Sequence, residues 1–227
     1  DKEHDVAIYF EMDPHKAFDA GQSTQMYEKD GLVLMKTGKA NQKLWVNKER
    51  EDCAWGYFYL GTKDDVTYAQ GDAAEMRAYF MREGDLKQMR MSNEKRYAAF
   101  AQKLDVNSNF PQHLTAAFDG LYTMAYFGED LRPYWNKNGE KTENLYKEAE
   151  KEYKEGMARC YEFDRQLMAD AFSVGGKEYA ELCALAYRQS VSAFQMSESS
   201  DGELLYFTPQ VGPVDEYYPA SPLYLRY

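Results

Sequence analysis

Three polar side chains, Tyr187, Arg188 and Gln189, follow one another in an otherwise apolar stretch of the chain. A guanidinium group is costly to bury unless a carboxylate, a carbonyl or a ligand compensates its charge. Two interpretations stay open from the sequence. Arg188 either forms an internal pair that ties helices together, or the three side chains face a ligand and bind a substrate.

A second group of candidate residues lies further along the chain. Asp215 and Glu216 precede Ser221-Pro222, a good N-cap followed by a good first helical residue. The start of a helix favours an ionised carboxylate, which suits a general base or an anchor for a substrate ammonium group. We therefore take Asp215 and Glu216 as candidate catalytic residues and Tyr218 as the floor of a binding pocket. The alternative is a solvated acidic loop.

The sequence gives no sign of a metal or a cofactor. The histidines lack the spacing of zinc ligands, and phosphate-binding glycine loops, nucleophile elbows and dinucleotide fingerprints are missing. Two acidic pairs, Asp64-Asp65 and Glu129-Asp130, lie in expected loops, where we interpret them as solvated rather than as calcium ligands. We expect no cofactor and no metal.

Composition limits the partners that the chain can bind. The net charge is −11 and the pI is about 4.9, so nucleic acid and anionic membrane surfaces are disfavoured. No apolar run approaches the roughly 18 residues that a membrane span needs. The three cysteines do not make a disulfide framework, and we expect Cys53, Cys160 and Cys183 to be buried thiols.

Up to about residue 127 the pattern is typical of strands. Short β-branched or aromatic runs alternate with glycines and aspartates, and their regular spacing predicts an antiparallel sandwich. The expected strands are Val6–Phe10, Leu32–Met35, Lys43–Val46, Cys53–Leu60, Val66–Ala69, Met76–Phe80, Tyr97–Ala101 and Leu114–Phe127. The pair Asp119-Gly120 is either a hairpin turn within the last of these strands or a kink in it.

Beyond about residue 142 the period changes to that of helices. Thr142 can cap a helix, apolar residues recur every three to four positions, and Gly175-Gly176 ends it. The next helix, Tyr179 to Phe194, is apolar on all sides, so one neighbouring helix cannot bury it. We predict a β-sandwich region over residues 1–127 and the start of a helical-hairpin region over 128–227. Because only five residues follow Ser221-Pro222, we expect a longer protein.

Four segments resemble the glutaminase A family. They are residues 119–135, 172–189, 202–207 and 214–225. The family comprises secreted bacterial and fungal proteins with an N-terminal β-sandwich and a C-terminal toroid of six helical hairpins. The resemblance implies an α+β chain and a secreted, periplasmic or cell-surface location. It also implies packing against the remaining hairpins of the toroid, and hydrolysis of the side-chain amide of L-glutamine to glutamate and ammonia.

Two other functions stay open. Toroids of six hairpins often cleave glycans with two carboxylates, which makes a glycoside hydrolase the first alternative. The second is a non-catalytic module that binds carbohydrate or peptide. It draws on two departures from the glutaminase A pattern: Ala193-Phe194 replace a His-Lys pair, and only residues 208–213 connect to the Val-Asp motif. Release of ammonia from glutamine or of reducing sugar from glycans distinguishes these functions.

Overall fold

The computed structural model describes residues 6–13, 22–39, 42, 44, 55–87, 97–105, 112–192, 194–207, 218 and 221. The chain splits into two compact units, residues 1–46 with 53–121 and residues 47–52 with 122–227. The predicted α+β class is confirmed, because antiparallel sheets precede a long helical segment. The domain boundary between residues 127 and 128 stays a prediction. Within the described part of the chain, no helix combines the length and apolarity needed to cross a membrane.

The first unit contains two antiparallel sheets. A three-stranded sheet has the order β1 (Val6–Met12), β6 (Tyr97–Leu104), β5 (Thr67–Gly71). A four-stranded sheet has the order β2 (Gln22–Lys29), β3 (Leu32–Lys39), β4 (Tyr57–Thr62), β7 (Thr115–Asp119). Met35 and Leu60 of the second sheet pack against Ala98 and Phe100 of the first, so the sheets form a sandwich-like core.

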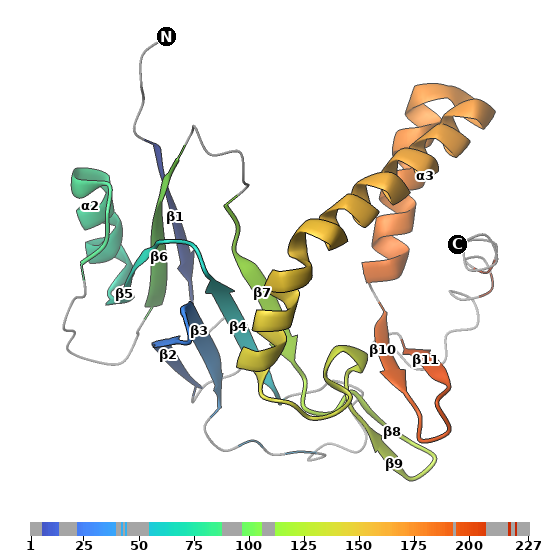
Figure 1. Cartoon of the computed structure of the whole chain (residues 1–227), viewed down its shortest axis with the longest axis horizontal. Coiled ribbons are helices and arrows are strands. Elements are labelled where there is room, and N and C mark those ends of the chain that lie inside the picture. The colour runs from blue at the N-terminus through green and yellow to red at the C-terminus, as the bar shows by residue number, and fades with distance from the viewer. Residues whose placement is uncertain are drawn as a thin grey trace. The chain divides into compact units, whose positions relative to one another are not determined.

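Helix α2 (Ala73–Glu83) covers the other face of the three-stranded sheet, as Figure 1 shows. Met76, which is fully buried, and Phe80 lie one helical turn apart and pack with Ala99 and Ala101 of β6. Arg77 on the exposed side of the helix forms an ion pair with Glu11 of β1. Strand β6 is therefore buried on both faces, between α2 and the second sheet.

The prediction of a strand over Met76–Phe80 is wrong. Asp72 caps α2, since its carboxylate accepts hydrogen bonds from two N–H groups of the first turn at 2.9 and 3.1 Å. Gly84 ends the helix in the left-handed conformation, at φ 66°, and its N–H bonds to the carbonyl of Phe80 at 2.7 Å. Both capping signals are readable in the sequence and outweigh the aromatic content of the segment.

Most of the other predicted strands are found, with shifted ends. The strand expected from Cys53 begins at Tyr57, and the alanine-rich Tyr97–Ala101 lies in β6, as its period of two indicated. Strand β2 was missed, because its sequence QSTQMYEK is mostly polar, as suits the edge of a sheet. The prediction for Lys43–Val46 falls mainly outside the described residues.

Both interpretations of Asp119-Gly120 are wrong. Strand β7 ends at Asp119, whose carboxylate accepts a hydrogen bond from the N–H of Leu121 at 3.0 Å. The next strand, β8 (Met124–Tyr126), pairs with β9 (Glu129–Leu131) in a separate sheet. The chain therefore leaves the four-stranded sheet here instead of turning or bending within it.

The second unit contains these two short strands, the 3-10 helix η1 (Tyr134–Asn136), helix α3 (Thr142–Ser192) and the hairpin of β10 (Gln195–Glu198) and β11 (Leu204–Phe207). Gly176 has non-helical angles, φ 76° and ψ −167°, and divides α3 into two arms. Figure 1 shows that the arms fold back on each other. The predicted helical hairpin with its turn at Gly175-Gly176 is confirmed, and the described residues show this one hairpin and no toroid.

Gly56, just before β4, lies very close to the backbone at the end of β7. Its N–H donates to the side-chain carbonyl of Gln42 at 2.8 Å, and its carbonyl accepts from the Gln42 amide at 3.0 Å. A Cβ atom at Gly56 would lie 2.6 Å from the carbonyl oxygen of Asp119, and φ is +115°. Only glycine therefore fits at this position, between Gln42 and the end of β7.

We predict that Gly56→Ala lowers the free energy of unfolding by about 3 kcal/mol, because strain and a backbone collision add. The matched control is Gly31→Ala in the β2–β3 turn, where φ is +80° but nothing lies within 4 Å of the added Cβ. That variant should lose only about 1 kcal/mol. Urea unfolding of both variants measures the difference, and equal losses would contradict the packing argument.

Candidate functional site

The candidate residues 187–189 lie on the second arm of α3, residues 177–192, which we call the return arm. The return arm packs on the first arm, residues 142–175, through a stripe that includes the fully buried Ala180. The ring of Tyr187 lies 5.0 Å from that of Phe163 on the first arm. Tyr187 therefore contributes to the contact between the arms.

Arg188 and Gln189 point away from this contact, and both are exposed. Successive residues of a helix project about 100° apart, so three consecutive side chains cannot share one face. The expectation that Arg188 is buried and needs an internal partner is wrong, because its charged group reaches solvent. Tyr187 therefore faces the first arm, whereas Arg188 and Gln189 lie on the exposed side of the return arm.

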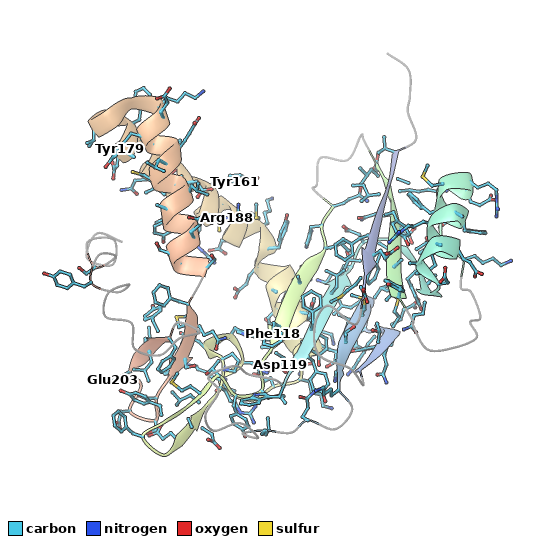
Figure 2. All side chains as sticks on the ribbon, turned by 180° about the vertical axis from the view of Figure 1, so that it is seen from behind. Phe118, Asp119, Tyr161, Tyr179, Arg188 and Glu203 are labelled. Carbon is cyan, nitrogen blue, oxygen red and sulfur yellow. The ribbon has the colours of Figure 1, made fainter. Side chains whose placement is uncertain are left out.

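The exposed side of the return arm has a polar flank and an apolar stripe. Lys177 and Glu181 pair across one helical turn on the flank, at 3.7 Å, and Arg188 lies on the same side two turns later. The apolar stripe carries Leu182 and Leu185, which are 62% and 52% exposed. Figure 2 shows Arg188 and Tyr179 on this arm and Tyr161 on the other. An amphipathic return arm of this kind offers an apolar packing surface beside a cationic group.

The cysteines differ from the prediction. Cys160 and Cys183 are both free thiols, but Cys160 is exposed and Cys183 is only partly buried. A hydrogen bond to Cys183, together with the negative charge that this side chain carries when it is ionised, raises the pKa of Tyr179 above its ordinary value. Cys53 lies outside the described residues. Neither Cys160 nor Cys183 is therefore the fully buried core residue that we expected.

The candidate carboxylates Asp215 and Glu216 lie outside the described residues. Tyr218 is described and exposed, and the hydroxyl of Ser221 donates to its carbonyl at 2.8 Å. This bond runs back along the chain, whereas an N-cap side chain accepts from N–H groups ahead of it. The N–H groups ahead of Ser221 belong to residues outside the described part of the chain, so its capping role stays a prediction.

The acidic pairs have structural partners. Asp64 accepts hydrogen bonds from the Gln102 side chain at 3.1 Å and from the N–H of His113 at 2.8 Å. Glu129 accepts from both the N–H and the hydroxyl of Ser200, and these bonds lower the pKa of the Glu129 carboxyl. No group of three or more metal-ligating side chains occurs among the residues that the structure describes.

Sequence reasoning missed a second surface, formed where the β8–β9 and β10–β11 hairpins meet. Tyr126 contacts Phe207 with ring centroids 5.8 Å apart, and the hydroxyls of Thr123 and Ser197 lie 2.6 Å apart. Lys137 pairs with Glu198 at 2.6 Å. The sequence signal was weak: Gly128 lies between two short alternating segments, but the residue before it, Phe127, is not one that two-residue hairpin turns favour.

The family described as Domain of unknown function (DUF5127) matches residues 1–170, and the chain belongs to this family. The match covers the whole first unit and ends inside the first arm of α3. No curated protein matches the sequence. Family membership therefore identifies the β-rich part of the chain, while the return arm lies beyond the matched residues.

We predict that Tyr187→Ala destabilises the protein by about 2 kcal/mol, because it removes the ring that packs on Phe163. Arg188→Ala should change the free energy of unfolding by less than about 0.5 kcal/mol, as is usual for exposed residues. Thermal and urea unfolding of the two variants provide the measurement. A loss of several kcal/mol in Arg188→Ala would restore the internal-pair interpretation.

Proposed function

We propose that this DUF5127 chain belongs to a secreted, periplasmic or cell-surface hydrolase that resembles glutaminase A. Its substrate is L-glutamine, and its products are glutamate and ammonia. Support comes from the four segments of resemblance, which extend from Asp119 to Leu225, together with the helical hairpin over 142–192. In this proposal the first unit is a scaffold, and the return arm contributes to the substrate site.

One observation carries the proposal furthest: the return arm combines an exposed apolar stripe with an exposed Arg188. Leucines that are more than half exposed need a further helical neighbour, which in this proposal is the next hairpin of a toroid. Arg188 then lies at the rim of that packing surface. A guanidinium group there binds the α-carboxylate of glutamine through paired hydrogen bonds.

The proposed chemistry uses the carboxylates of Asp215 and Glu216. Asp215 takes a proton from water while the water oxygen attacks the side-chain carbonyl carbon of glutamine. The C–N bond then breaks, the proton passes to the departing nitrogen, and glutamate and ammonia leave. Glu216 anchors the α-ammonium group, Tyr218 forms the floor of the pocket, and Gln189 hydrogen-bonds the substrate from the return arm. Tyr187, which packs on Phe163, positions that arm.

A non-catalytic binding module is the second candidate, because specific residues favour it. Ala193-Phe194 cannot transfer protons as the family's His-Lys pair can, and the connection over 208–213 is short. A glycoside hydrolase is the third candidate, supported only by analogy with other six-hairpin proteins. In that case Asp215 and Glu216 act on a glycosidic bond.

We predict that Asp215→Asn lowers ammonia release from L-glutamine at least about 100-fold, which is the usual contribution of a general base. Its free energy of unfolding should change by less than about 1 kcal/mol. Asp201→Asn, in the exposed turn between β10 and β11, is the matched control and should keep full activity. The assay uses the protein with its remaining hairpins. Normal turnover by Asp215→Asn, or reducing sugar instead of ammonia from the unchanged protein, would contradict the proposal.

We also predict that Arg188→Gln raises KM for glutamine at least about tenfold while kcat changes little, because the lost contact binds the substrate carboxylate. Lys177→Gln, on the same flank of the return arm, serves as the charge-matched control and should leave KM unchanged. Steady-state kinetics separates the two parameters. An equal rise of KM in both variants would indicate only a loss of positive charge, not a specific contact.

A further inference from the structure

Phe127 has a backbone conformation that is unfavourable for phenylalanine. It is the first of two residues linking β8 to β9, and Tyr126 pairs with Glu129 across the turn. Phe127 has φ 44° and Gly128 has φ 91°. Two positive φ angles are typical of type I′ turns, which favour asparagine, aspartate or glycine in the first position. A phenylalanine there is strained.

The same chain shows the ordinary residue choice in another hairpin. The β2–β3 turn uses Asp30-Gly31, with φ of 55° and 80°. Its geometry matches that of Phe127-Gly128, so the turn alone does not require an aromatic side chain. Phe127 is also 92% exposed, so the fold buries almost none of its ring. Neither turn geometry nor burial in this chain accounts for the phenylalanine.

Contacts at the base of the turn hold it in place. The ring centroids of Tyr126 and Phe127 lie 4.6 Å apart, with an interplanar angle of 75°. Phe207 of β11, in the neighbouring hairpin, contacts Tyr126. The Glu129 carboxylate accepts two hydrogen bonds from Ser200 between β10 and β11. These contacts between the two hairpins hold the backbone of the turn in place before a partner binds. Binding at Phe127 would therefore cost less conformational entropy.

The surface around Phe127 is acidic. Segments 124–131 and 195–207 contain five acidic residues and no lysine or arginine: Glu129, Asp130, Glu198, Asp201 and Glu203. Lys137 pairs with one of these carboxylates, Glu198. Figure 2 shows Glu203 on this side of the second unit. A partner that contacts Phe127 therefore meets negative charge at the border of the contact.

We propose that Phe127 is the anchor of a docking surface for a protein partner. The partner presents an apolar pocket bordered by lysine or arginine, as an amphipathic basic helix does. Aromatic anchors that fill a pocket carry much of the binding energy in such contacts, and the acidic border steers association. The negative border disfavours nucleic acid and anionic lipid. The 75° angle between the two rings means that they do not form one coplanar surface.

The test uses Phe127→Asn in the full chain. Asparagine is favoured at this position of a type I′ turn, so the variant should be as stable as the unchanged protein or more stable. The probe is a synthetic amphipathic helical peptide of leucine and lysine, with a leucine–glutamate peptide as control. Titration calorimetry should show that the substitution weakens binding of the lysine peptide at least about tenfold. Asp30→Asn, the same turn position in the β2–β3 hairpin, is the matched variant and should bind normally.

Four results would overturn the proposal. The first is no binding of the lysine peptide to the unchanged protein, and the second is equal binding by Phe127→Asn. The third is a marked loss of thermal stability in Phe127→Asn, which would make Phe127 a residue of the fold. The fourth is binding of a neutral oligosaccharide that competes with the peptide and is lost with Phe127, which would make the surface a glycan site.

Discussion

The packing of strand β6 between two layers is the constraint on which the first unit depends. Its small residues Ala99 and Ala101 face α2, while Ala98 and Phe100 face the four-stranded sheet. Alanine on one face lets the helix lie close to the sheet, and Phe100 fills the space between the sheets on the other. Every strand of the three-stranded sheet pairs with β6 or is β6 itself, so this strand organises both layers.

The second unit is organised by a helix contact instead of a sheet. Gly176 reverses α3, and Gly175 lets the ring of Tyr179 cover the turn, because a Cβ at Gly175 would lie 2.5 Å from Cγ of Tyr179. The return arm then uses one stripe for the first arm and leaves another exposed. The hairpin stabilises itself on one side and offers its leucines to a neighbour on the other.

Local sequence signals predicted the fold well where they agreed with each other. The alternating runs of β3 and β6 were sufficient to predict these strands, and the glycine pair of α3 was sufficient to predict the helical hairpin. The failures came from competing signals: Asp72 and Gly84 define α2 although it contains the aromatic pair Tyr79 and Phe80, and polar β2 has too few apolar residues to be noticed. Pairing with distant strands decides such cases, and a linear pattern does not contain it.

The candidate site was harder to predict than the fold. The sequence shows that Arg188 lies in an apolar helix, but which face of that helix packs depends on Phe163, many residues earlier. Burial was therefore inferred from neighbours in sequence, whereas the side chain lies on the exposed flank. For Phe127 the relevant signal was conformational, since only the positive φ shows that its residue type is unusual.

The pairing of β1 with β6 has a consequence for the order of folding. Val6 pairs with Leu104, so the three-stranded sheet closes only after the chain has been made past that residue. Until then β1 has no partner for its ladder, and the entropy of closing so long a loop delays its pairing. The two arms of α3 are adjacent in sequence and meet quickly. During synthesis, the late closure of this sheet exposes an early strand to other chains for longer than any element of the hairpin.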